Sequence, residues 1–187
     1  MDDSKLALFL LLGQTAGRTA STFPGVAPPE PLLLSDTYDL GILMPDMVRE
    51  AIAASQGYKL FFVFENYLRE LVVEVLSKEA ATNWWDKVPK DVQDDVAKLE
   101  QTEEAKRWMA IGSRDKSALM SYPQLLRVIE QCWTMGFDDL LRDKSLVQEA
   151  RLLTHLRNTL CHMTPISEEE MERVRQVMRD WFRMAAP

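Results

Sequence analysis

Apolar residues recur at helical spacing along most of the chain after residue 46, and the widest apolar arc covers residues 58–79. Its members are Leu60, Val63, Phe64, Tyr67, Leu68, Leu71, Val72, Val75 and Leu76. An arc of this width is typical of a helix that is buried on most of its surface. We therefore predict a central core helix over 58–79, with a shorter helical pattern before it and a break or kink at Gly57.

Other segments repeat the helical period, namely 91–102, 122–133, 145–163 and 171–182. A helix is also expected through residues 105–109, and NWWDKVP (83–89) is typical of a turn. Ser167 stands three residues before Glu170, which is the spacing of a capping box at a helix start. No segment alternates like a β-strand and no internal repeat is visible. The predicted fold class is all-α, most simply a helical bundle.

The first 45 residues differ from the rest of the chain because they contain a proline-rich stretch. Four of the nine prolines fall between residues 24 and 31, where they prevent a continuous helix or a central strand. Before them, residues 1–17 are expected to form a short helix with Leu6, Phe9 and Leu10 on one side. We predict two parts, an N-terminal helix with a Pro-rich arm over 1–45 and a helical domain over 46–187.

The composition is that of a soluble globular protein, with 47% hydrophobic and 27% charged residues. The formal net charge of −7 argues against a protein that coats nucleic acid, although a local basic pocket is compatible with it. The apolar run from Leu6 to Leu12 is too short to span a membrane. Acids precede it, whereas a secretory signal begins with basic residues. We expect a cytoplasmic protein without membrane association.

Cys132 and Cys161 lie far apart in apolar helical segments and form no paired motif. We expect two buried free thiols in a reducing cytoplasm. Two histidines without a cysteine pair argue against a structural zinc site, and no glycine-rich phosphate loop is present. No cofactor and no metal are therefore expected.

The segment 145–163 carries both histidines of the chain. On an ideal helical wheel one narrow polar stripe holds Arg151, His155, Asn158 and His162. The expected core arc holds Leu152, Leu153, Leu156, Leu160 and Met163. Arg157 lies beyond the far edge of that arc, about 140° from His162. The segment is either a plain amphipathic helix with a polar stripe, or a site built on Arg157, Asn158 and His162.

These three residue types suit cleavage of an RNA phosphodiester. Histidine exchanges protons near neutral pH, so His162 can take the 2′-hydroxyl proton or protonate the leaving 5′-oxygen. The planar guanidinium of Arg157 can stabilise the charge that builds on the phosphoryl oxygens. Asn158, one turn before His162, can orient the imidazole. Such a reaction requires no metal because the adjacent 2′-hydroxyl is the nucleophile.

The segment RNTLCH (157–162) matches the R-x4-H signature of the HEPN superfamily, including a polar residue directly after the arginine. The resemblance extends to FENYLRELV (64–72), the Trp84–Trp85 turn followed by a proline, YPQLLRVIEQCW (122–133) and PISEEE (165–170). It covers roughly residues 46–184. Together these segments look like the HEPN subgroup that is found beside PIN-type nuclease domains and as stand-alone prokaryotic proteins.

This resemblance implies an antiparallel helical bundle that forms a homodimer and brings two R-x4-H helices together around a cleft. It also implies a metal-independent endoribonuclease that leaves 2′,3′-cyclic phosphate and 5′-hydroxyl ends, as toxin-like or phage-defence effectors do. In a dimer, an arginine and a histidine from different faces of the helix can meet across the two-fold axis. The catalytic candidates are Arg157, Asn158 and His162, and the supporting candidates are Glu65, Arg69 and His155.

Glu65 and Arg69 stand four residues apart with the acid first, which is the favourable order for an ion pair on a helix. They are interpreted either as a structural pair or as groups that border the cleft and orient Arg157 or His162. Trp84 and Trp85 are expected to pack in the core rather than to stack on bases.

A local excess of basic residues lies within 105–127, where five basic residues accompany one acid, Asp115. Four of them are candidates for RNA binding: Lys106, Arg107, Arg114 and Lys116. The alternative is a scattered set of solvated charges. One departure from the family concerns regulation. HEPN toxins that a nucleotidyltransferase antitoxin inactivates carry a tyrosine after the histidine, and this chain has none after Tyr122. The resemblance therefore does not imply that route, and an antitoxin or another regulatory protein stays a candidate partner.

Three functions follow from these observations. The leading expectation is a HEPN endoribonuclease that acts on RNA. The second is a non-catalytic module for dimerisation or RNA binding that retains the motif. The third is a regulatory partner whose N-terminal apolar run docks another protein.

Overall fold

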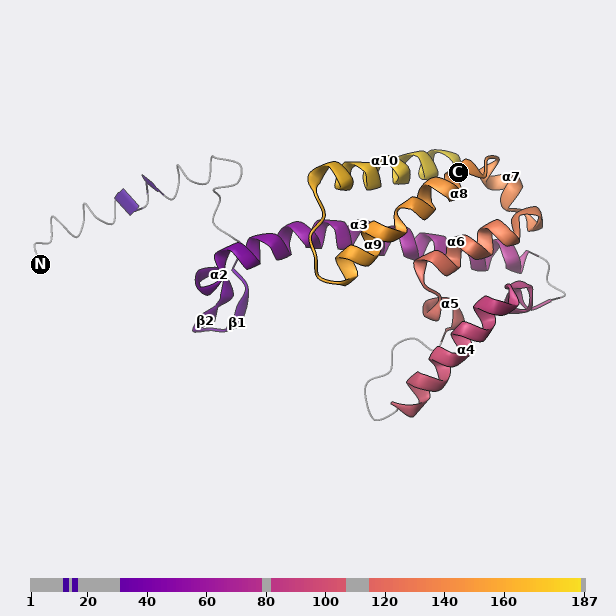
Figure 1. Cartoon of the computed structure of the whole chain (residues 1–187), viewed down its shortest axis with the longest axis horizontal. Coiled ribbons are helices and arrows are strands. Elements are labelled where there is room, and N and C mark those ends of the chain that lie inside the picture. Colours follow the sequence, from indigo (N-terminus) through magenta and orange to yellow (C-terminus); the bar gives the residue numbers. More distant parts are fainter. Residues whose placement is uncertain (1–11, 14, 17–30, 79–81, 107–114, 186–187) are drawn as a thin grey trace, which may run out of the picture. The chain divides into compact units, whose positions relative to one another are not determined.

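The computed structural model describes residues 12–13, 15–16, 31–78, 82–106 and 115–185 (Figure 1). Most of the predicted N-terminal helix, the predicted helix through Trp108 and Met109, and the candidates Arg107 and Arg114 lie outside the described residues. The chain divides into two compact units, Met1–Ser55 and Gln56–Pro187. The predicted domains 1–45 and 46–187 stay a prediction.

The first unit contains a small antiparallel hairpin of β1 (Leu33–Ser35) and β2 (Tyr38–Asp39), which is followed by α2 (Leu40–Leu43). Asp39 joins the two elements, because its carboxylate accepts from the backbone N–H of Leu32 at 3.1 Å and of Gly41 at 2.7 Å. The prediction that no segment forms a strand is wrong here. Strands of two and three residues are too short to show an alternation of apolar and polar positions.

Helix α3 (Pro45–Ser77) is continuous, and the predicted break at Gly57 is wrong. A Cβ atom at Gly57 would lie 2.7 Å from Cδ1 of Leu160, which is closer than two carbon atoms can approach. The glycine therefore serves close packing of another helix against α3 instead of ending the helix. Pro45 occupies the first helical position, where its missing N–H removes no hydrogen bond.

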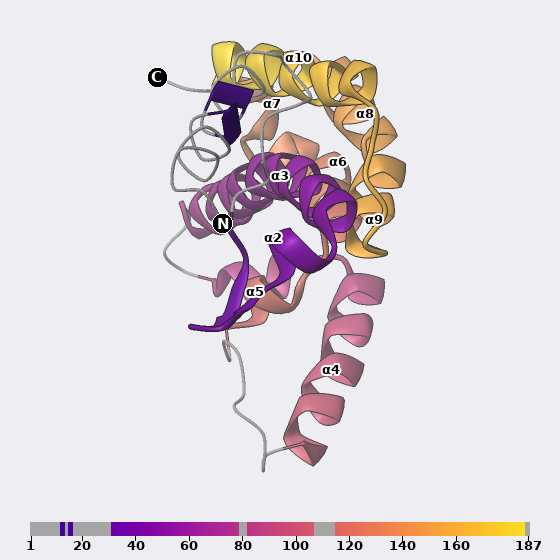
Figure 2. The ribbon, with the colours of Figure 1, turned by 90° about the vertical axis from the view of Figure 1, so that its left-hand side faces the viewer.

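The second unit continues with helices. In chain order they are η1 (Trp84–Lys87), α4 (Lys90–Ala105), α5 (Lys116–Leu119), α6 (Tyr122–Gln131), η2 (Trp133–Met135), α7 (Phe137–Leu141), α8 (Ser145–Leu152), α9 (Thr154–Cys161) and α10 (Glu168–Ala185). In Figure 1, α8 and α9 run opposite to α6 and α10. Figure 2 shows α10 and the α8–α9 pair around one side of α3. The predicted all-α helical bundle is confirmed.

Aromatic side chains from several helices fill the centre of this bundle. Phe64 of α3, Tyr122 of α6, Phe137 of α7 and Trp181 of α10 are fully buried, and the rings of Phe64 and Trp181 meet edge to face at 5.5 Å. The Tyr122 hydroxyl donates to the carbonyl of Ala150 at 2.7 Å, which ties α6 to α8. Burial, and then the nearby charge of Glu65, raise the pKa of Tyr122 well above its ordinary value.

The predicted helix over 145–163 is two helices. At Leu153 the backbone N–H bonds to the carbonyl of Ala150, three residues back, and this tightened turn separates α8 from α9. Leu153 is buried, but Leu152 and Met163 are 74% and 89% exposed. Their predicted place in the core is wrong: Leu152 is the last residue of α8, and Met163 follows the end of α9 in the left-handed conformation.

The starts and connections of the other elements agree with the sequence in several places. Ser167 accepts from the backbone N–H of Glu170 at 3.2 Å, as its spacing predicts. Trp84 and Trp85 pack against each other and against the core. Across the described residues, no helix has both the length and the apolar character that crossing a membrane requires.

Candidate functional site

Helix α9 carries the R-x4-H segment and ends in a defined turn. The N–H of Met163 bonds to the carbonyl of Leu160 at 3.0 Å, and the N–H of Thr164 bonds to that of Thr159 at 3.1 Å. This is the hydrogen-bond pattern of a Schellman C-cap, with His162 as the cap residue. Met163 holds the left-handed position with φ +59°. The turn therefore fixes the backbone of His162 at the end of α9.

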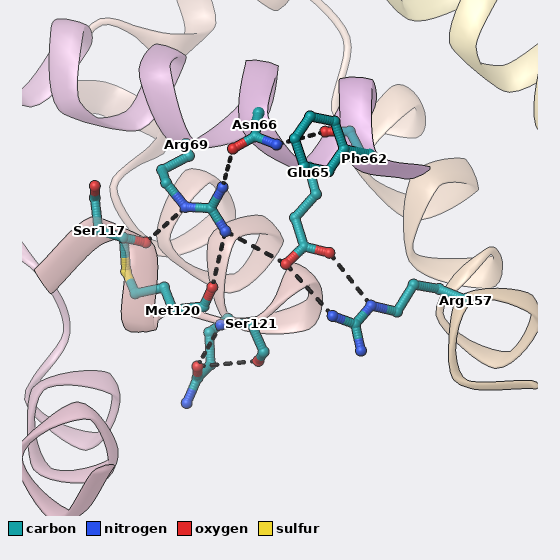
Figure 3. Close-up of polar contacts among 9 residues, drawn as sticks. Phe62, Glu65, Asn66, Arg69, Ser117, Met120, Ser121 and Arg157 are labelled. Carbon is teal, nitrogen blue, oxygen red and sulfur yellow. Dashed lines mark hydrogen bonds and ion pairs between the residues drawn. The ribbon is translucent and has the colours of Figure 1, made fainter. Parts of the chain in front are cut away.

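The guanidinium of Arg157 faces helix α3 and pairs with Glu65. Nε of Arg157 donates to Oε2 of Glu65 at 3.2 Å, and Nη2 donates to Oε1 at 3.5 Å (Figure 3). This contact joins residues 92 positions apart in sequence. The carboxylate occupies one edge of the guanidinium fork. On the other edge, Nη1 has no hydrogen-bond acceptor among the described residues.

Arg69 shares the same carboxylate, since its Nη2 lies 3.4 Å from Oε1 of Glu65. The rest of its guanidinium is also used. Nε donates to the carbonyl of Ser117 at 2.8 Å, Nη1 to Oδ1 of Asn66 at 2.6 Å, and Nη2 also to the carbonyl of Met120 at 3.4 Å (Figure 3). Arg69 therefore anchors α3 to the segment that contains α5.

The two arginines consequently have different environments around one acid. The side chain of Glu65 is 14% exposed, that of Arg69 is 16% exposed and that of Arg157 is 26% exposed. Arg69 has acceptors at all three guanidinium nitrogens, whereas Arg157 keeps a donor edge open. Arg157 therefore has a free donor edge for a further anion, whereas each guanidinium nitrogen of Arg69 already donates.

A cavity of about 250 Å³ adjoins this cluster. Its walls come mainly from α3 and α9: Tyr58, Phe61, Phe62, Glu65, Asn66, Arg69, Ala118, Arg157, Leu160 and Cys161. Three of the α9 residues, Arg157, Leu160 and Cys161, follow the i, i+3, i+4 spacing of one helix face. The cavity thus places the free Nη1 edge of the Arg157 guanidinium between mainly apolar walls.

The structure separates the predicted site residues into two groups. Arg157, Glu65 and Arg69 lie together at the cavity. Asn158 and His162 are exposed and do not line it, and the supporting candidate His155 is also exposed. Within one copy of the chain, the arginine and the histidine of the motif therefore belong to different faces of α9.

The basic candidates that the structure describes do not join this cluster. Nζ of Lys116 lies 5.0 Å from the ring centre of Trp85, which is a cation–π contact. Lys106 is exposed at the end of α4. The prediction of two buried thiols is half wrong, since Cys132 is buried and Cys161 is exposed. Among the residues that the structure describes, no three His, Cys, Asp or Glu side chains gather as they would around a metal ion.

Sequence reasoning missed several contributors to the cavity. Asn66 orients Arg69 and donates its own Nδ2 to the carbonyl of Phe62 at 2.7 Å. Asn66 stands three residues before Arg69, and this spacing on a helix could have indicated the contact. Tyr58 and Phe62 lie outside the predicted core arc of 58–79, and no motif marks them. Ser117 and Met120 act through backbone carbonyls, which no side-chain pattern reveals.

Comparison with known protein families identifies the family of this chain. A family model described as Swt1-like HEPN matches residues 59–185, a range that includes Glu65, Arg69 and the whole R-x4-H segment. The chain belongs to the Swt1-like HEPN family, and its predicted membership of the HEPN superfamily is confirmed. HEPN domains commonly dimerise and bind RNA, and the family points to an RNA-related, ribonuclease-type function in general terms. The PIN-associated subgroup stays a prediction.

Two further searches gave no relative. No match was found among curated proteins, and none among solved structures.

Proposed function

We propose that this protein is a metal-independent endoribonuclease that cleaves RNA by attack of a 2′-hydroxyl on the adjacent phosphodiester. The observation that carries the proposal is the open donor edge of Arg157 in a cavity where Glu65 fixes the other edge. Family membership supports the same class of reaction.

In the proposed reaction, the 2′-oxygen forms a bond to phosphorus while the bond from phosphorus to the 5′-oxygen breaks. The products are a 2′,3′-cyclic phosphate and a 5′-hydroxyl end. Arg157 binds the non-bridging oxygens and stabilises the charge that they gain in the transition state. Glu65 keeps the guanidinium in place, and Arg69 in turn keeps Glu65 in place, because both arginines share that carboxylate.

The proton transfers fall to His162. Its imidazole takes the 2′-hydroxyl proton or gives one to the leaving 5′-oxygen. Since His162 is exposed at the end of α9 and outside the Arg157 cavity, we propose that the working site is shared between two copies of the chain. The Arg157 cavity of one protomer faces His162 of its partner across a two-fold axis. Asn158, which is also exposed, orients that imidazole.

The biological role in this proposal is that of a toxin-like or phage-defence effector, which cuts RNA and is restrained by a partner such as an antitoxin. What favours this role is the resemblance of the R-x4-H segment and its surroundings to such proteins. The alternative is a non-catalytic HEPN module for dimerisation or RNA binding. The separation of Arg157 from His162 within one copy favours that alternative if the chain is a monomer.

The direct test is cleavage of total RNA and of tRNA by the purified protein in EDTA. Arg157→Ala and His162→Ala are assayed beside the wild type. We expect the wild type to leave 2′,3′-cyclic phosphate ends and both variants to lose cleavage. A wild type that binds RNA without cutting it supports the non-catalytic alternative, and variants that cut as well as the wild type contradict the assigned site.

A further inference from the structure

Two aromatic side chains stand exposed on α3 beside the Arg157 cavity. Tyr58 is 63% exposed and Phe62 is 57% exposed, one helical turn apart. Phe61, between them in sequence, is buried in the core. Large exposed apolar groups that lie next to each other mark binding surfaces more often than single ones do.

Tyr58 and Phe62 lie close to each other without stacking. Their centres are 6.1 Å apart and their planes are inclined by 34°, so the rings touch at an angle and do not cover each other. Both rings line the same cavity as Arg157 and Glu65. A ligand whose anionic group reaches the open edge of Arg157 therefore lies beside aromatic faces.

Charge alone gives this protein little affinity for RNA. The net charge is −7, and the arginines at the cavity already share one carboxylate. Binding of single-stranded RNA by such a surface has to draw on stacking, which contributes roughly 1–3 kcal/mol per base and tolerates any base. Exposed aromatic rings next to a phosphate-binding arginine supply that contribution.

We infer that Tyr58 and Phe62 form a base-stacking subsite for single-stranded RNA, which holds the base of a nucleotide next to the phosphate at Arg157. This inference rests on the proposed function and adds a substrate class to it. The RNA is unpaired at the site, because a paired base cannot offer its face to a ring. The subsite selects single strands over duplexes and does not read sequence.

The experiment measures binding and stacking without cleavage. The probe is a single-stranded 2′-O-methyl oligonucleotide that contains 2-aminopurine, whose fluorescence falls when it stacks. It lacks the nucleophilic hydroxyl. Tyr58→Leu and Phe62→Leu keep an apolar side chain but remove the aromatic face. We expect each to weaken binding by about tenfold and to reduce the quenching.

Three controls make the result specific. Tyr58→Phe and Phe62→Tyr keep a ring, so their affinities stay within about twofold of the wild type. Tyr38→Leu removes an exposed ring that does not line the cavity and leaves binding unchanged. With a probe that carries abasic sites in place of bases, both leucine substitutions at the cavity lose their effect.

The outcomes also separate this inference from the proposed function. If the wild type cuts RNA but the leucine variants bind and quench normally, the stacking subsite is wrong and the ribonuclease stands. If the leucine variants weaken binding while the wild type cuts no RNA, the subsite stands and the ribonuclease is wrong. Sedimentation without RNA tests a third possibility, namely that the two rings contact a second copy of the chain. If Tyr58→Leu or Phe62→Leu dissociates a dimer, the rings face a second copy and the inference is overturned.

Discussion

The two faces of helix α9 present different chemistry. The face toward α3 holds Arg157, Leu160 and Cys161 at a cavity, with the guanidinium fixed by Glu65. The other face exposes His155, Asn158 and His162 to solvent. Residues of one six-residue motif are thus divided between a fixed, half-buried arginine and an exposed histidine.

This difference indicates what each half of the motif lacks. The Arg157 cavity can hold a phosphate, but no histidine lines it among the described residues. His162 can transfer a proton, but the face of α9 that it shares with His155 and Asn158 carries no arginine or lysine. Two copies arranged about a two-fold axis supply both groups to each site. The following substitutions test this division, from the largest expected effect to the smallest.

Arg157→Ala should reduce RNA cleavage by about 100-fold or more, because it removes the group that stabilises the transition-state charge. The matched control is Arg151→Ala on α8, six residues earlier, where the arginine pairs with Glu130 instead of lining the cavity. Single-turnover cleavage assays should find the control within about twofold of the wild type. Equal losses in both variants would mean that general positive charge matters and the cavity does not.

Glu65→Gln should lower the free energy of unfolding by about 2 kcal/mol, since it leaves two arginines in the cluster without their carboxylate. Cleavage should fall as well, because Arg157 loses its fixed orientation. Glu130→Gln is the control, because it breaks the more exposed pair with Arg151 and should cost less than about 1 kcal/mol. Urea denaturation of both variants measures the difference, and similar losses would show that the Glu65 cluster is an ordinary surface network.

Tyr122→Phe should cost about 1 kcal/mol at neutral pH, because Ala150 loses its hydrogen-bond donor. The folded-state pKa of Tyr122 is raised by burial, so its protonated form stabilises the fold below pH 10.0, the ordinary pKa of the group, and this contribution is lost as the pH rises further. The advantage of the wild type over Tyr122→Phe should therefore shrink above that pH. Thermal unfolding across the range checks the sign, and cleavage at neutral pH should be unaffected.

Met163→Gly should raise the free energy of unfolding by up to about 1 kcal/mol, because glycine holds the left-handed position without steric cost. The exposed methionine side chain loses no core contact. If the Schellman turn only has to place His162, cleavage should stay within about twofold. A variant that is destabilised by this change would contradict the C-cap assigned to the end of α9.

Sequence reasoning predicted the bundle well where a buried face continues through one helix. The arc over 58–79 and the segment 122–133 correspond to the core parts of α3 and α6, except that Val63 is exposed and Phe61, which the arc omits, is buried. It failed where tertiary contacts override a local pattern. Gly57 permits the approach of Leu160 instead of breaking a helix, and a tightened turn at Leu153 divides the predicted helix into α8 and α9.

For the candidate site, the sequence named the motif and its supporting pair, and one of two interpretations had Glu65 and Arg69 orient Arg157 or His162; the spacing alone could not decide between the two. The Glu65–Arg157 contact spans 92 residues, so no local spacing predicts it. The wheel correctly separated Arg157 from His162. Arg69 is held by the backbone carbonyls of Ser117 and Met120. A pattern of side chains cannot predict these contacts, because every residue has a backbone carbonyl.

The most direct test of a shared site is to mix Arg157→Ala with His162→Ala. Each variant alone is expected to be inactive. After subunit exchange, about half of the dimers carry one chain of each kind, and each mixed dimer has one site with an intact arginine and an intact histidine, so about a quarter of wild-type cleavage should return. If the mixture cuts RNA no better than the separate variants while the wild type is active, Arg157 and His162 act within one chain and the shared site is contradicted.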